Sequence, residues 1–268
     1  MAARAIWKGK LQLGRTTVPV ALYSAVVDKT VHFHVLDERT ETRVKQHMVS
    51  PQSKKEVASD EIQKGYQIKP GVFVILTKEE LEKLQPKQSR DIDISRFVQP
   101  KNVSSLWYDR PYYLGPDGDE SAYFALAEAL ANKETEGIAH WVMRGKEYVG
   151  ALRAQGDYLM LVTLRHAEEV VPVEALPSPK GRALDKKEIN MARQLIDALA
   201  GEFDPREFRD EYRERVMEFI EQKAKGKKPR LHAVKSKKAT PSLASALSKS
   251  IAMLKKQQEK KKKEKIAA

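Results

Sequence analysis

The sequence has no cysteine among its 268 residues. Disulfide bonds, cysteine-ligated zinc, iron–sulfur clusters and thiol nucleophiles are therefore excluded, and nothing indicates an oxidising compartment. No apolar run approaches the roughly 18 to 20 residues that a membrane span requires. The start of the chain also lacks the apolar core of a secretory signal. These absences predict a soluble, cytoplasmic protein with no membrane association.

Motifs that carry catalysis are missing as well. The chain has no glycine-rich phosphate loop, no GxSxG elbow and no HExxH helix. Asp91 and Asp93 share a strand face, as paired glycosidase carboxylates do, but solvated strand carboxylates are far commoner. Lys8 and Lys10 could form Schiff bases with an abasic sugar, although solvated or phosphate-facing lysines are the commoner case. The sequence thus predicts a protein that is not an enzyme and needs no cofactor.

A metal site is not predicted either. His32 and His34 alternate onto one face of an expected strand, and His47 follows. A zinc site needs three or four ligands at fitting distances, whereas isolated surface histidines are common. We expect these histidines to bind no metal.

Positive charge dominates the total but is unevenly placed. The chain carries 49 Lys and Arg against 37 Asp and Glu, a net charge of +12. Residues 1–178 balance at 24 of each sign, with the basic excess in residues 1–100, whereas residues 230–268 carry 12 basic against two acidic side chains. A neutral body binds a polyanion only if its basic residues gather on one surface. The tail is charged enough to bind one without sequence preference.

Alternating apolar residues predict strands near the start of the chain. These first strands are expected over residues 6–13, 18–22 and 31–35. A further strand is expected over residues 72–76. Thr77 and Glu80 then have the spacing of a capping box, which predicts a short helix over residues 78–84. Another strand or extended arm is expected over residues 92–97.

Between residues 37 and 69 the apolar pattern weakens and basic side chains accumulate. A long segment of this kind in a compact domain is usually functional or disordered. It is either a solvated loop or an arm laid along a nucleic-acid backbone, since its Ser, Thr, Gln and His side chains also donate to phosphate oxygens. It lacks the interleaved aromatic residues that stack single-stranded bases, which favours a duplex as the ligand.

The middle of the chain combines one helix with a meander. An extended aromatic segment over residues 109–114 leads into a helix predicted over residues 121–132. The side chains expected to face inward from this helix are Phe124, Leu126, Ala127 and Leu130. Three strands joined by short turns are expected over residues 137–144, 146–154 and 157–165.

After a proline-punctuated linker the pattern changes to helices. Asp185 and Glu188 have capping-box spacing ahead of one apolar stripe. Asp204 followed by Pro205 predicts the start of a second helix, which ends at Gly226.

Six different short motifs follow one another along the chain. They are Arg-Ala-Ile-Trp-Lys-Gly at residues 4–9, Val-Pro-Val at 18–20, Ser-Arg-Asp-Ile-Asp-Ile at 89–94, Tyr-Asp-Arg-Pro-Tyr-Tyr-Leu-Gly-Pro at 108–116, Arg-Gly-Lys-Glu at 144–147 and Phe-Asp-Pro at 203–205. Each motif is weak alone, but the ordered series resembles the bacterial Ku family over about residues 1–230. Arg15 departs from the family, which usually has an apolar residue there. Some relatives carry a cysteine pair in the arm that residues 48–55 lack, so no metal is implied.

The resemblance implies a protein that binds double-stranded DNA ends in non-homologous end joining and recruits an ATP-dependent DNA ligase, ligase D. Members are expected to be homodimers whose two arms close a ring that DNA threads. A ring reads backbone and shape rather than bases, which suits breaks of arbitrary sequence. Such a protein would be cytoplasmic and associated with the bacterial nucleoid.

The expected fold class is α+β: a central antiparallel β-barrel with a long extended arm, a small helical C-terminal region and a disordered basic tail. The barrel core is expected over residues 1–178, with its arm at about 37–100. The ligase-docking helices are expected over residues 179–229, and the flexible lysine-rich tail over residues 230–268. An apolar stripe at residues 243–254 leaves open a last helix in that tail, with or without a protein partner.

Two sets of contact residues follow from the charge, the exposed aromatic residues and the resemblance. The residues expected to contact DNA phosphates are Arg39, Arg43, Lys45, Lys54, Lys55, Lys64, Arg144 and Lys146. The residues expected to dock the ligase are Phe203, Phe208, Tyr212 and Phe219, unless they pack on the barrel instead. Arg90 is open: it either contacts DNA or pairs with a neighbouring carboxylate, Asp91 or Asp93.

Two other functions compete with end binding. A general nucleic-acid chaperone or chromatin-like protein, bound through the basic tail, would bind circular and linear duplexes equally. An abasic-site lyase using Lys8 or Lys10 would leave an adduct that borohydride traps.

Overall fold

The computed structural model describes residues 4–177 and 185–226. The chain divides into two units, Met1–Leu176 and Pro177–Ala268, each taken separately below. The tail at residues 230–268, with its stripe at 243–254, lies outside the described residues.

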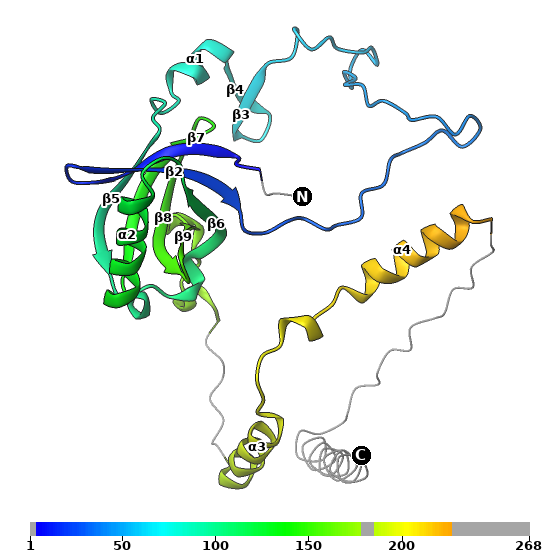
Figure 1. Ribbon diagram of the computed structural model, residues 1–268. Coiled ribbons are helices and arrows are strands. Elements are labelled where there is room, and N and C mark those ends of the chain that lie inside the picture. Colours follow the sequence, from blue (N-terminus) through cyan, green and yellow to red (C-terminus); the bar gives the residue numbers. More distant parts are fainter. Residues whose placement is uncertain (1–3, 178–184, 227–268) are drawn as a thin grey trace. The chain divides into compact units, whose positions relative to one another are not determined.

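Seven strands of the first unit form a closed barrel in the order β1-β2-β6-β9-β8-β7-β5 (Figure 1). The strands are β1 (Trp7–Leu13), β2 (Thr16–Ser24), β5 (Asp91–Val98), β6 (Tyr108–Pro116), β7 (Glu136–Met143), β8 (Lys146–Gln155) and β9 (Tyr158–Leu164). Every pairing is antiparallel except β1 with β5, where Lys10, Leu11 and Gln12 run parallel to Asp91, Ile92 and Asp93. The predicted barrel and α+β class are confirmed, with this one parallel pairing added.

Alternation along the strands fills the barrel. In β1 and β2 the fully buried side chains include Leu11, Val20 and Leu22, while Lys8 and Lys10 on the other face of β1 stay exposed. The same period of two lets β6, β8 and β9 each present one apolar row inward. These rows supply Leu114, Leu152, Leu159 and Leu161, all buried.

Helix α2 (Glu120–Lys133) packs against this core, beginning at the N-cap Asp119. Ala127 and Leu130 face inward as predicted, but Phe124 is 44% exposed and Tyr123 is fully buried instead. The Tyr123 hydroxyl donates to the Leu114 carbonyl at 2.5 Å and accepts from the Leu159 amide at 2.8 Å. These two bonds satisfy a polar atom inside the core, so the buried ring is a tyrosine and not the neighbouring phenylalanine.

Between β2 and β5 the chain leaves the barrel as an extended arm (Figure 1). The arm contains β3 (Lys64–Lys69), paired antiparallel with β4 (Val72–Leu76), and then α1 (Lys78–Lys83). The predicted capping box at Thr77 and Glu80 is present. The strand expected over residues 31–35 does not form, and β3 lies where a loop was expected.

The second unit contains α3 (Lys186–Leu199) and α4 (Glu211–Ala224). The prediction that Asp204 and Pro205 begin the second helix is wrong. They begin a single 3₁₀ turn (Pro205–Glu207), and Asp210 caps α4 by accepting from the Arg213 amide at 2.9 Å. The remaining 3₁₀ turns lie in the first unit, at Pro100–Asn102, Ser105–Trp107, Ala167–Glu169 and Val173–Ala175.

Candidate nucleic-acid interface

The turn between β7 and β8 presents two of the predicted contact residues. Arg144 (φ 54°) and Gly145 (φ 73°) are both left-handed, as a two-residue hairpin turn of type I′ requires. Met143 and Lys146 close the ladder on either side. Arg144 and Lys146 are therefore held at the tip of a rigid hairpin, and both are exposed.

A first turn in the arm carries Arg39 and Arg43. Asp37 organises it, since its carboxylate accepts from the backbone amides of Arg39 and Thr40, each at 2.9 Å. These hydrogen bonds lower the pKa of Asp37 below its ordinary value, with the bond from Thr40 contributing most. A bridge between Leu36 and Arg43 closes the turn.

A second turn in the arm carries Lys54 and Lys55. A bridge between Val49 and Glu56 closes it, and Lys54 takes a positive φ of 56° at its tip. His47 contacts the Glu56 carboxylate, so this histidine has an acidic partner within the turn.

The eight predicted cations are all exposed, and within the described residues none forms an ion pair with a carboxylate. They are Arg39, Arg43, Lys45, Lys54, Lys55, Lys64, Arg144 and Lys146. Some other barrel cations are paired, such as Lys8 with Asp117 at 2.6 Å and Arg165 with Asp109 at 3.3 Å. The structure brings Arg144 and Lys146 together, while the arm cations are spread along separate turns. Their contact with DNA stays a prediction.

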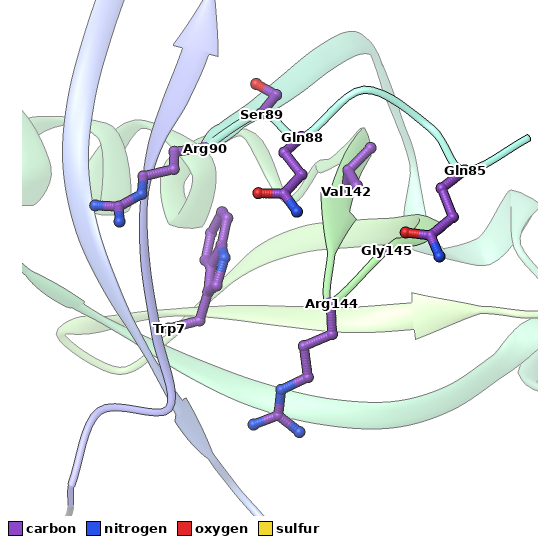
Figure 2. Close-up of a pocket in the computed structure, with 8 residues that line it drawn as sticks. All are labelled: Trp7, Gln85, Gln88, Ser89, Arg90, Val142, Arg144 and Gly145. Atoms are coloured by element: carbon purple, nitrogen blue, oxygen red, sulfur yellow. The ribbon is translucent and has the colours of Figure 1, made fainter. Parts of the chain in front are cut away.

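A hollow of about 620 Å³ lies where the arm rejoins the barrel, beside the β7–β8 turn (Figure 2). Its lining residues are Trp7, Gln85, Gln88, Ser89, Arg90, Val142, Arg144 and Gly145. The walls of this hollow come from three separate stretches of chain, so no local sequence pattern indicates it. Arg90 lines it and, within the described residues, makes no ion pair with Asp91 or Asp93, so the alternative of such pairing is wrong.

At the opposite end of β7 a carboxylate is buried. Glu136 is fully buried, and its carboxylate accepts from the Tyr108 hydroxyl at 2.5 Å and from Arg153 at 3.2 Å. Burial, followed by the hydrogen bond to Glu136, raises the pKa of Tyr108 to about 12. The Arg153 guanidinium also lies over the Tyr108 ring, 5.6 Å from its centre. This cluster links β6, β7 and β8 at this end of the barrel, and the Arg153 side chain at its edge stays 38% exposed.

The aromatic residues predicted to dock a partner are largely exposed in the second unit. Phe203 and Phe208 are 76% and 70% exposed and stack on each other, with ring centres 5.1 Å apart. Tyr212 is also exposed, whereas Phe219 is half-buried beneath Lys223. Neither α3 nor α4 has a buried residue among those described. Among the described residues, therefore, nothing buries the apolar faces of these helices, and docking of a partner on them stays a prediction.

In the part of the chain that the structure describes, no group of three or more metal-ligating side chains comes together. Across residues 4–177 and 185–226, the helices are also too short or too polar to cross a bilayer.

Comparison with known proteins gives one consistent family. A family model described as "Ku70/Ku80 beta-barrel domain" matches residues 12–191. The chain is 36% identical to "Non-homologous end joining protein Ku 2" of Geotalea uraniireducens over 85% of this chain and 89% of that protein. It is also 36% identical to "Non-homologous end joining protein Ku" of Coxiella burnetii over 84% of each chain. The protein of that name from Heliobacterium modesticaldum is 36% identical over 97% of this chain and 95% of its own.

Proposed function

The chain belongs to the Ku family, and on that premise we propose that it binds the ends of double-stranded DNA during non-homologous end joining in the bacterial cytoplasm, at the nucleoid. The observation that carries the proposal is the set of eight exposed cations that have no carboxylate partner among the described residues, on a body of zero net charge. Cations of this kind bind phosphates and read no bases. The role is binding and recruitment rather than catalysis.

The arm supports a homodimer. Its β3–β4 hairpin is exposed on both faces, although it carries the large apolar residues Tyr66, Ile68, Phe73 and Ile75. A two-stranded sheet without a covered apolar face is marginal in water. A second copy of the chain would cover this surface and close the two arms into a ring around a duplex about 20 Å wide. Light scattering should give twice the 30.4 kDa of one chain, and a monomer at micromolar concentration would contradict the ring.

A gel shift with one DNA sequence in linear and closed-circular form tests end binding. A ring loads only where a duplex terminates, so linear DNA should be shifted and a minicircle should not. Equal binding of both forms would instead favour the nucleic-acid chaperone, which needs only the tail.

Deleting residues 230–268 separates these two functions further. Loss of the tail removes a net charge of +10, so it should weaken binding strongly at low salt and leave the preference for linear DNA intact. If the deletion abolished that preference, the barrel and arm would not be the recognition element.

The second unit is proposed to dock ligase D. The exposed Phe203 and Phe208 rings stack on each other in the segment between α3 and α4, and exposed aromatic side chains of this kind are what protein partners cover. Replacing Phe203 and Phe208 by serine in the full chain should preserve DNA-end binding but lose stimulation of the ligase. Full stimulation by this variant would overturn the docking site.

The lyase is the weaker alternative. The Lys8 ammonium is held by the Asp117 carboxylate at 2.6 Å, whereas a Schiff base needs a free amine. Lys8 therefore fits a lyase poorly. Lys10 is exposed and makes no ion pair within the described residues, so a borohydride-trapped adduct that Lys10→Gln abolishes would favour this alternative.

A further inference from the structure

The hollow beside the β7–β8 turn combines an indole and two amide side chains with its arginines, a mixture that contacts to duplex phosphates alone do not require. Two arginines, two glutamines, one serine and one indole line it, and no carboxylate is among its lining residues. Its volume of about 620 Å³ falls within the range of small-ligand sites, ~300–1,000 Å³. A second hollow of about 340 Å³ adjoins it and shares Trp7 and Arg90 as walls. The indole thus borders open space on two sides.

Trp7 is held in place by the barrel. Its side chain packs against the core, and the ring folds over Gly9, where an added Cβ would lie 2.2 Å from the indole. Only a glycine leaves room for the ring in this position. The indole is therefore a fixed surface at the wall of the hollow rather than a mobile side chain.

The two arginines are placed by backbone structure. The Arg90 carbonyl accepts from the Lys10 amide at 2.8 Å, just before the parallel pairing of β1 with β5 begins. Arg144 sits at the rigid hairpin tip described above. Figure 2 shows Trp7 lying between Arg90 and Arg144, with Gln88 beside the indole. At the rim, the Ser89 hydroxyl donates to the Asp91 carboxylate at 2.9 Å.

We propose that this hollow binds one unpaired nucleotide of a single-stranded tail at a DNA end, a claim that rests on the proposed function. The base lies against Trp7, and its phosphate binds Arg90 and Arg144, whose guanidinium groups match phosphate oxygens in pairs. A base inside a duplex is stacked on both faces, so the indole can take either an unpaired base or the outer face of a terminal pair, and the blunt-ended duplex in the test below separates the two. Gln85 and Gln88 both donate and accept, which lets the site tolerate any base.

The test compares hairpin duplexes that carry either a blunt end or a tail of four thymidines. Stacking of one base gives the tailed duplex an advantage in affinity of about tenfold in the natural protein. Arg90→Gln and Trp7→Leu should reduce the ratio of tailed to blunt affinity to about one. Trp7→Phe keeps an aromatic face and should keep most of the ratio. Lys133→Gln removes one charge at the far end of β7 and should leave the ratio unchanged.

Tryptophan fluorescence makes the result independent of end binding. In a Trp107→Phe background the accessible indole is Trp7, because Trp141 is only 3% exposed. Single-stranded tetrathymidylate should quench this signal, and Arg90→Gln should abolish the quenching. If blunt and tailed duplexes bind equally and no quenching occurs, the hollow is not a nucleotide site, although end binding stands. If quenching is present but linear and circular DNA bind equally, the hollow stands and the proposed function fails. Thymidine 5′-monophosphate offers the same base and one phosphate, so it should quench the signal as well. Quenching by tetrathymidylate but not by the monophosphate would overturn a site for one nucleotide in favour of a longer contact with the strand.

Discussion

Replacing Arg144 and Lys146 together by glutamine should flatten the salt dependence of DNA binding. Both side chains are exposed and make no ion pair in the described part of the chain, so the change removes charge without breaking a contact. Each lost phosphate contact reduces the slope of log K against log salt by about 0.9. A dimer presents the turn twice, so four contacts are lost and the slope falls by about 3.6.

Fluorescence anisotropy with a blunt duplex measures this slope. When salt rises from about 50 to 200 mM, both proteins bind more weakly. The factor by which the affinity of the natural protein falls should be about 150 times the factor for the variant. Unfolding curves should be unchanged, because glutamine accepts the same backbone conformation as the residues it replaces. A monomer would show only half the change, about 1.8 in slope, which would contradict the dimer but keep the turn on the DNA.

The matched control is Lys133→Gln, compared with Lys146→Gln alone. Lys133 ends α2 just before β7, and Lys146 follows that strand. The eight residues of β7 separate them by about 26 Å. The control should leave the slope unchanged. An unchanged slope in the turn variant, or an equal fall in the control, would refute the assignment of the turn to DNA.

Three further predictions concern the barrel. Arg153→Met should lower the free energy of unfolding by about 3 kcal/mol in urea titrations, because it leaves the buried Glu136 carboxylate with Tyr108 alone; an unchanged midpoint would contradict this. The raised pKa of Tyr108, about 12, means that the unfolded chain ionises first, so stability should fall as pH rises from about 10 to 12. The loss of stability between about pH 10 and 12 should be smaller in Tyr108→Phe. An identical pH profile in that variant would show that ionisation of Tyr108 is not the cause. Gly150→Ala should cost about 2 kcal/mol, since its Cβ would lie 2.7 Å from the Trp141 ring, and calorimetry showing no drop in Tm would disprove the close approach.

Local pattern sufficed for the barrel strands. The alternation that buries Leu11, Val20 and Leu22 is visible without any partner strand, because a strand with one covered face must alternate. The capping box at Thr77 could be predicted from sequence as well, because both of its hydrogen bonds join residues within a span of four. The exposure of Arg144 and Lys146 could also be predicted locally, because both residues lie at the turn between two predicted strands.

The errors occurred where a pattern lacked its tertiary partner. Residues 31–35 alternate, yet Phe33 and Val35 are both 68% exposed and no strand pairs with them within the described part of this chain. Asp204 and Pro205 have the residue types of a helix start, but Asp210 supplies the N-cap that α4 uses. β3 was missed because only Tyr66 and Ile68 alternate in it, which is too short a run to predict a strand.

Composition and local pattern by themselves determined the class of this protein: no thiol chemistry, a neutral body with a basic tail, an α+β order of elements and a family resemblance. Tertiary structure alone decided how the barrel closes, since the parallel pairing of Lys10 with Asp91 joins strands far apart in the chain. It also decided that Trp7, Arg90 and Arg144 share one hollow. Local pattern records which face of an element is apolar, but it carries no record of which distant element will cover that face.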